Sequence, residues 1–138
     1  MQGFHSFEHS GDLGLEISGD DLQGLFEQAG EAFTDIVTDL STVRAATASE
    51  IQIQALDVEQ LLVEWLSELI YRFDAHGQLF REYHVSSLDD ARLLAMARGE
   101  RFDPDRHPLR TSVKAATYHQ LELKQSENGW TARVIFDL

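Results

Sequence analysis

The 138-residue sequence contains no cysteine, which excludes disulfide bonds and thiolate metal sites. It has no apolar run of the roughly 20 residues that a membrane-spanning helix requires. The first residues, MQGFHSFEH, lack the basic segment and the apolar stretch of an export signal. From these absences we expect a cytoplasmic protein that does not interact with a membrane.

Positively charged residues are also scarce. The chain has 11 lysines and arginines against 24 acidic residues, which gives a formal net charge of -13. Up to residue 74 there are 15 acidic residues and only two arginines, so this half repels nucleic acid and suits a basic protein partner or a divalent cation. Five of the 11 positive charges fall within residues 98–114, where a solvated loop and an anion-binding site explain the cluster equally well.

Catalytic and nucleotide-binding motifs are missing as well. The sequence has no Walker loop, no GxGxxG and no GxSxG. Its histidines do not have the HExxH spacing of a zinc site, and no nucleophile lies in a pattern that pairs it with a base. We therefore predict that the protein is not an enzyme.

The length and composition predict one globular domain over residues 1–138. Hydrophobic residues make up 43% of the chain and charged residues 25%, as in ordinary globular proteins. The chain is long enough for a hydrophobic core, and no linker, repeat or low-complexity segment divides it.

The clearest pattern is a helical one over residues 57–74, DVEQLLVEWLSELIYRFD. Asp57 is a favourable N-cap, and Gln60 three residues later completes a capping-box pattern. We expect this helix to end near Asp74, ahead of Gly77. Apolar residues with the i, i+3, i+4, i+7 spacing make it the main core element; they are Val58, Leu61, Leu62, Trp65, Leu66, Leu69, Ile70 and Phe73.

A second helix is predicted over residues 21–38, with Asp20 as its N-cap and an apolar face from Leu22 to Val37. Segment 89–98 consists of helix formers but is equally open to a strand. Two long helices and several strands joined by turns predict an α+β domain, with the helices packed on one face of a mostly antiparallel sheet. The remaining segments are a loop over 99–110, which holds both prolines, and strands over 4–8, 13–18, 43–56, 79–85, 112–124 with a break near 115–116, and 130–138.

The C-terminal hairpin carries the first candidate site. An Asn-Gly pair at residues 128–129 predicts a type I′ turn, and a two-residue loop there pairs Leu121 with Phe136. Asp137 then lies on the opposite face of the strand, next to the α-carboxylate of Leu138. Two adjacent carboxylates either repel or share a cation, and a hard cation such as calcium or magnesium suits them. A frayed, solvated terminus is the competing interpretation.

Asp12 is a second candidate ligand, near the other end of the chain. It lies in a turn between Gly11 and Gly14, where a ligand and an ordinary turn aspartate both fit the pattern. The residues alone therefore predict an acidic α+β domain with one candidate cation site, made of oxygen ligands.

Taken together, the motifs resemble those of the archease family. FEHSGDLG near the start resembles the family's HTADxG motif, and the helix over 57–74 is similar to its central helix. GERFDPDRHP, VKAATYHQLEL and the terminal WTARVIFDL follow in the family's order, so the resemblance covers essentially the whole chain. Ser10 and Gly11 replace Thr and Ala of the motif, and Leu138 stands where the family often has Ile. None of these changes removes an acidic group.

This resemblance implies a function and a partner. Archeases are small α+β proteins that activate the RtcB-type RNA ligase. That ligase joins RNA ends bearing a 2′,3′-cyclic phosphate or 3′-phosphate to a 5′-hydroxyl, in tRNA splicing and RNA repair. Archeases promote guanylylation and multiple turnover of the ligase without ligating RNA themselves. The resemblance therefore implies that this protein contacts RNA only indirectly, through the ligase.

The resemblance also implies a metal site. The family binds a divalent cation, described as calcium in its usual form, and magnesium is the alternative. Its ligands map onto Asp12, Asp137 and the terminal residue Leu138. The same resemblance places residues 89–98 in a strand.

The basic loop supplies a second set of expected contacts. We expect Arg106, His107 and Lys114 to contact the ligase or a phosphate group. The alternative function is a general chaperone or an RNA-processing adaptor that binds a protein partner. The acidic surface argues against binding of free RNA, and the absence of an additional apolar stripe argues against a chaperone.

Overall fold

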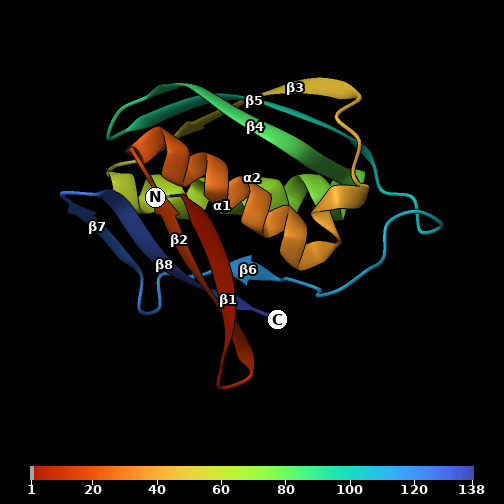
Figure 1. The fold of residues 1–138 in the computed structure, drawn as a ribbon, viewed down its shortest axis with the longest axis horizontal. Coiled ribbons are helices and arrows are strands. Elements are labelled where there is room, and N and C mark those ends of the chain that lie inside the picture. The colour runs from red at the N-terminus through yellow and green to blue at the C-terminus, as the bar shows by residue number, and fades with distance from the viewer. Residues whose placement is uncertain (1) are drawn as a thin grey trace.

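The computed structural model describes residues 2–138, apart from the side chain of His9. Two antiparallel sheets enclose two helices (Figure 1). The first sheet has the order β1-β2-β8-β6, with β7 also paired to β8; its strands are β1 (Gly3–His9), β2 (Asp12–Gly19), β6 (Ala115–Ala116), β7 (Glu122–Ser126) and β8 (Gly129–Asp137). The second sheet has the order β3-β5-β4; its strands are β3 (Thr47–Gln54), β4 (Gln78–Leu88) and β5 (Arg92–Arg101). The helices are α1 (Leu22–Val37) and α2 (Val58–His76), with a short 3-10 turn at Leu40–Thr42.

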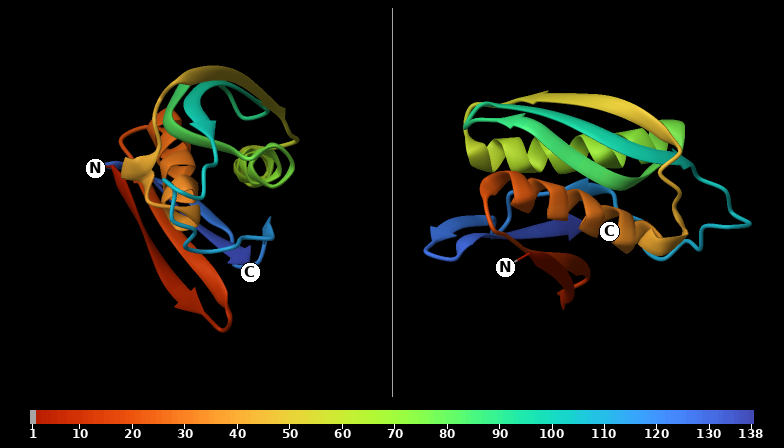
Figure 2. Two further views of the ribbon diagram at one scale, coloured as in Figure 1. Left: turned by 90° about the vertical axis from the view of Figure 1, so that its right-hand side faces the viewer. Right: turned by 45° about the horizontal axis from the view of Figure 1, so that its top comes forward.

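The helices form the middle layer, as the two views in Figure 2 show. α1 packs against β4 of the second sheet and β2 of the first, and α2 packs against the second sheet and against β6. This architecture confirms the predicted α+β class, but the strands are divided between two sheets where the sequence predicted one. Alternating residues indicate a strand and its buried face but not its partner, and β3, β4 and β5 pair among themselves.

α2 begins and ends with the capping groups that the sequence predicts. The Asp57 carboxylate accepts a hydrogen bond from the Gln60 backbone N–H at 2.8 Å, and the Gln60 side chain accepts one from the N–H of residue 56 at 2.7 Å. The helix runs two residues past the predicted end, to His76, and stops at Gly77, whose φ of 66° is left-handed. At its centre, fully buried Trp65 donates through Nε1 to the Phe26 carbonyl of α1 at 3.0 Å, which ties the two helices together.

α1 begins one residue later than predicted. Its N-cap is Asp21, whose carboxylate accepts from the Gly24 N–H at 2.6 Å, and the expected N-cap Asp20 lies outside the helix. Gly19, just before Asp20, lets β2 approach the first turn of α1, because a Cβ on it would lie 2.3 Å from the Leu25 backbone nitrogen.

The structure shows the secondary structure of two segments for which the sequence pattern was ambiguous or interrupted. Residues 92–101 form β5, so the segment that was open between helix and strand is a strand. In the segment 112–124 the prediction is wrong, because residues 115–116, where a break was expected, pair with β8, and the interruption lies at residues 117–121. Thr117 still donates its N–H to the Ile135 carbonyl at 3.0 Å, so the chain leaves β8 only after this residue.

The register predicted for the C-terminal hairpin is also wrong. Phe136 does not pair with Leu121; it lies between Leu13 of β2 and Ala116 of β6. The β7–β8 ladder is shifted by two residues, and its turn is formed by residues 127–128. A shift of two preserves the face of every side chain, so the buried face of β8 is as predicted.

The backbone of the turn explains the shift. A type I′ turn requires positive φ at both central residues, but Asn128 does not have one and only Gly129 does, with φ 126°. Gly129 is instead the first residue of β8, where a Cβ would lie 2.3 Å from the Gly19 carbonyl oxygen. The glycine is therefore needed for the approach of β8 to the end of β2, not for the turn itself.

Candidate functional site

Asp12 is held by the tight turn between β1 and β2. Ser10 has φ 46° and Gly11 has φ 90°, so this hairpin has the two left-handed central residues that suit the twist of its strands. The backbone of His9 pairs with that of Asp12. Asp12 is thus the first residue of β2, next to the turn that joins β1 to β2 at the bottom of Figure 1.

The strand register brings Asp12 next to Asp137. Leu13 pairs with Phe136 in the β2–β8 ladder, so the next position of this antiparallel ladder sets Asp12 opposite Asp137. Directly opposed residues have Cβ atoms about 4.5–5.5 Å apart. The two carboxylates, from opposite ends of the chain, can therefore bind one cation together.

Lys114 joins this position from the other side of β8. Its backbone N–H donates to the Asp137 carbonyl at 2.8 Å, and Ala115 pairs with Asp137. The following position of the β6–β8 ladder therefore sets Lys114 opposite Leu138. We call the group of Asp12, Lys114, Asp137 and Leu138 the strand-end site.

The charged side chains of the strand-end site form no ion pair within the described part of the chain. Asp12, Lys114 and Asp137 have no ion-pair partner among the residues that the structure describes, and Lys114, Asp137 and Leu138 are exposed to solvent. Within that part of the chain no three His, Cys, Asp or Glu side chains are grouped as a metal site would need. A third oxygen ligand from Leu138, which the family resemblance implies, stays a prediction. An all-oxygen set of this kind fits calcium or magnesium by its chemistry.

The structure places two residues of the basic loop in a different cluster. Glu100 accepts hydrogen bonds from Arg106 and, at 2.9 Å, shares one with His107 Nε2. The backbone N–H of Arg44 also donates to Glu100 at 2.8 Å. Arg106 holds the pKa of the Glu100 carboxyl down at about 2, helped by these N–H donors, from an ordinary value of 4.5. We call Glu100, Asp103, Arg106 and His107 the Glu100 cluster.

His107 is the centre of this cluster and not a surface contact. Its side chain is 0% exposed, and its Nδ1 accepts the Asp103 backbone N–H at 2.8 Å. That bond makes Nδ1 the unprotonated nitrogen and leaves Nε2 as the donor to Glu100. The expectation that His107 contacts a ligase or phosphate is therefore wrong, because both of its nitrogens are used inside the loop.

Arg106 is only partly free for a partner. Its guanidinium binds Glu100 and lies 3.5 Å from an Asp103 oxygen, and its side chain is 32% exposed. A contact between Arg106 and a ligase stays a prediction. Glu100 was not among the residues expected from the sequence, although the motif GERFDPDRHP contains an acid ahead of Arg106 and His107. The spacing alone does not show that the loop folds back to bring them together.

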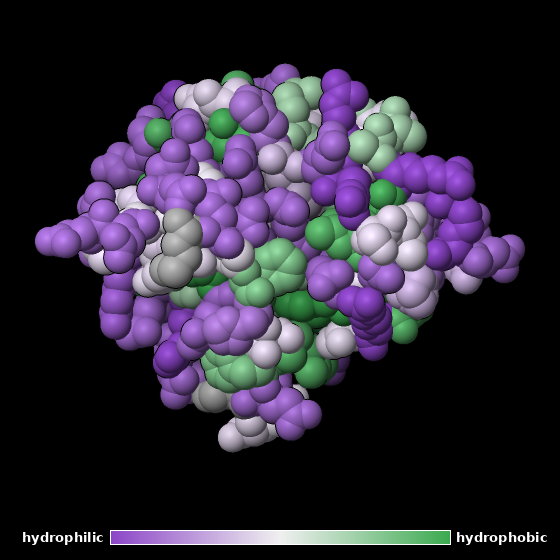
Figure 3. All heavy atoms as spheres, in the orientation of Figure 1, coloured by the Kyte–Doolittle hydropathy of each residue, from purple (hydrophilic) through white to green (hydrophobic). Residues whose placement is uncertain are grey.

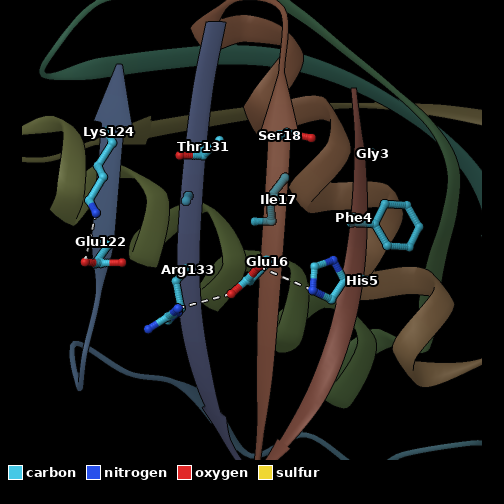
Figure 4. Close-up of a pocket in the computed structure, with 11 residues that line it drawn as sticks. Gly3, Phe4, His5, Glu16, Ile17, Ser18, Glu122, Lys124, Thr131 and Arg133 are labelled. Atoms are coloured by element: carbon cyan, nitrogen blue, oxygen red, sulfur yellow. Dashed lines mark hydrogen bonds and ion pairs between the residues drawn. The ribbon is translucent and has the colours of Figure 1, made fainter. Parts of the chain in front are cut away.

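The outer face of the first sheet carries a shallow pocket of about 480 Å³ with matched charges (Figure 4). Glu16 lies 3.3 Å from His5 and 3.2 Å from Arg133, on the neighbouring strands β1 and β8. At the edge of the pocket Lys124 lies 3.3 Å from Glu122. Each full positive charge in this pocket already has an acidic partner, so the strand-end site is the better candidate for binding a cation or a charged partner.

Comparison with known proteins identifies the family. Residues 4–138 match the archease protein family. The chain belongs to this family. Protein archease from Methanosarcina acetivorans is 35% identical over 139 residues, which covers 98% of this chain and 95% of that protein. Protein archease from Sulfurisphaera tokodaii is 35% identical over 140 residues and is covered completely.

Solved structures of archeases and related proteins have the same fold. The solution structure of Methanobacterium thermoautotrophicum protein 1598 superposes with a TM-score of 0.81 at 34% identity, over the whole of both chains. The crystal structure of a Thermotoga maritima archease, described as a possible chaperone, gives a TM-score of 0.67 over 96% of this chain and 94% of that one. At 18% identity the Thermotoga protein supports the archease fold alone. No helix of the described residues is long and apolar enough to cross a membrane.

Proposed function

We propose that this archease is a non-catalytic activator of an RtcB-type RNA ligase in tRNA splicing or RNA repair, and that it acts through the strand-end site. The observation that carries the proposal is the register of β2, β8 and β6. It gathers Asp12, Lys114, Asp137 and Leu138 at one end of a sheet although they come from distant parts of the sequence. Membership of the archease family supports the choice of partner.

The site supplies geometry and electrostatics to the ligase. Asp12 and Asp137 offer carboxylate oxygens from adjacent strands, and Leu138 offers its α-carboxylate. A divalent cation bound there would neutralise these carboxylates and draw them together. Lys114 then presents an ammonium group that can donate to a carboxylate or phosphate of the ligase complex. The result is one ordered docking edge that includes the Gly11 turn.

Ligation assays test this function. The protein should accelerate guanylylation and multiple-turnover ligation by the ligase, and it should join no RNA when the ligase is absent. Asp12→Ala and Asp137→Ala should abolish the acceleration while circular dichroism shows an intact fold. Asp90→Ala is the matched control, because Asp90 is an exposed acid in the β4–β5 turn of the other sheet.

Two results would contradict the proposal. No acceleration by the unchanged protein would exclude the function, and full acceleration by a folded Asp137→Ala variant would exclude the mechanism.

A general chaperone is the second candidate, because the related Thermotoga protein is described as a possible chaperone. The surface favours it less. The face in Figure 3 is mostly hydrophilic, with hydrophobic residues gathered along its middle. The large exposed apolar side chains of the described residues come from six separate segments of the chain; they are Leu56, Tyr71, Met96, Leu109, Tyr118 and Leu138. Suppression of the aggregation of an unfolded client, equal in wild type and Asp137→Ala, would favour the chaperone.

A further inference from the structure

The segment 100–116 connects the second sheet to the first, and we call it the strap. Apart from its two ends it forms no strand or helix. Fixing each residue of such a segment in one conformation costs conformational entropy. A strap that presents Lys114 in one place therefore needs strong anchors along its length.

The Glu100 cluster is the first anchor. The Asp103 N–H donates to His107 Nδ1, and the backbone N–H of His107 donates to the Asp103 carbonyl at 2.8 Å. Glu100 then fixes the far side of the His107 ring, and the Phe102 ring lies 5.9 Å from it. Residues 100–107 are thus closed into a compact turn around one buried imidazole.

Arg110 is the second anchor, at the end of α1. Its backbone N–H donates to the Val37 carbonyl at 2.8 Å, one of the carbonyls that a helix end leaves without a partner. Its guanidinium donates to the Asp35 carbonyl at 3.1 Å and lies 3.8 Å from an Asp39 oxygen. These contacts are 46% exposed at the arginine, so water and salt weaken them.

The third anchor is the strand-end site itself. Val113 is buried in the core, and Lys114 and the two residues after it bind β8. Only the first anchor is built from several charged or polar groups around a buried polar side chain, that of His107. Breaking such a cluster frees the whole turn, because the partners that remain are left without hydrogen bonds in a place that excludes water.

We infer that Glu100 and His107 are positioning residues for Lys114, because they close the strap whose other end holds that lysine against β8 beside Asp137. The inference rests on the proposed function for its activity readout, while its structural readout does not depend on the ligase. Pre-organisation of this kind raises activity by avoiding the ordering of a loop when the partner binds.

The structural test is hydrogen exchange at the Lys114 amide, which bonds to Asp137. His107→Phe keeps a ring of similar size and removes both hydrogen bonds. This variant should exchange the Lys114 amide at least about tenfold faster than wild type. The amide of Ala55, which bonds to the carbonyl of residue 91 just beyond the end of the β3–β5 ladder, should change only with global stability. Ile53→Ala, a core change in β3, is the control and should not accelerate Lys114 selectively.

A milder variant, His107→Asn, keeps the test possible if His107→Phe does not fold. His107→Asn retains an acceptor for the Asp103 N–H and loses the donor to Glu100, so its effects should be intermediate. At a temperature where each variant is folded, maximal activation of the ligase should fall in the order wild type, His107→Asn, His107→Phe, and Ile53→Ala should match wild type.

The outcomes separate the two claims. The inference would be overturned if, in both His107 variants, the Lys114 amide exchanged no faster relative to the Ala55 amide than in wild type. It would also be overturned if the Lys114 amide exchanged selectively faster while activation of the ligase stayed complete. If the wild type itself fails to activate the ligase, the proposed function is wrong, and the exchange data still decide whether the Glu100 cluster orders the strap.

Discussion

The Glu100 cluster and the strand-end site both contain acidic and basic residues, but they differ in whether the carboxylates have partners within the fold. In the cluster, the Glu100 carboxylate binds Arg106, His107 and a backbone N–H, so its charge is satisfied within the fold. In the strand-end site, Asp12 and Asp137 have no ion-pair partner among the described residues. Charge that the fold has satisfied is structural, and charge that it leaves open is available to a cation or a partner.

The energetics of ion pairs explain why the two differ. Removing one member of a buried pair leaves a charge that water cannot reach, which is strongly destabilising. Exposed charges contribute little to stability, so substitutions there are tolerated by the fold. Variants of the cluster should therefore change stability first, and variants of the strand-end site should change activity alone.

The largest expected effect is on activation of the ligase, and it should differ between the two lysines of the chain, Lys114 and Lys124. Lys114→Ala should lower activation of the ligase by about 10- to 100-fold, the range over which a misplaced group alters catalysis, with the free energy of unfolding changed by no more than about 0.5 kcal/mol. Lys124→Ala is the control, because Lys124 is exposed and already lies beside Glu122. Equal activation by both variants in multiple-turnover ligation would remove Lys114 from the site.

The next effect is on stability, at the cluster. Glu100→Ala should lower the free energy of unfolding by about 1–3 kcal/mol, because the buried His107 then loses its acceptor. Arg106 is 32% exposed, so the loss of its carboxylate partner adds little. Urea unfolding measures this, with Glu122→Ala as a control that should cost less than about 1 kcal/mol. A loss at Glu100 no larger than at Glu122 would show that the cluster is not a structural anchor.

The cluster also predicts a dependence of stability on pH. The pKa of Glu100 is lower in the folded chain, at about 2, than the ordinary value of 4.5, so the folded state favours the ionised carboxylate. Its contribution is complete above about pH 4.5 and is lost as the pH falls towards 2. Unfolding followed between these values should show a shallower decline for Glu100→Gln than for wild type. Parallel curves would contradict this assignment.

The smallest effect is expected at the exposed anchor. Arg110→Ala should cost no more than about 1 kcal/mol at low salt, and the difference from wild type should shrink as salt screens the Asp35 and Asp39 contacts. Thermal unfolding at two salt concentrations measures the change. No loss at either salt concentration would mean that the backbone bond to Val37, which Arg110→Ala keeps, and not the guanidinium, holds the strap.

Local patterns in the sequence predict the elements well and their assembly poorly. The helix over 57–74 follows from apolar spacing and from the Asp57 cap, both of which are properties of adjacent residues. The division of the strands into two sheets and the register of β8 depend on contacts between distant segments, such as Gly129 against Gly19. Spacing along the chain contains no information about those contacts.

The same limit applies to the candidate site. Turn and strand patterns made Asp12, Asp137 and Leu138 candidates, and the resemblance to a family joined them into one ligand set. The strand register places Asp12 and Asp137 on adjacent strands. The burial of His107 was missed, because a histidine in a basic, proline-containing loop has no local feature that shows whether it faces water or a carboxylate seven residues earlier. Lys114 was named as a loop contact, and only the β6–β8 ladder places it beside the terminus.

We propose that the open carboxylates of the strand-end site bind one divalent cation. Calorimetric titration with calcium, repeated with magnesium, tests it on the wild-type chain, on Asp137→Ala and on a chain extended by one glycine after Leu138. We predict one ion per wild-type chain, with affinity reduced at least about tenfold in both variants, because each removes or displaces an oxygen ligand. Unchanged affinity in the extended chain would exclude the terminus as a ligand, and no binding by the wild type would contradict the claim itself.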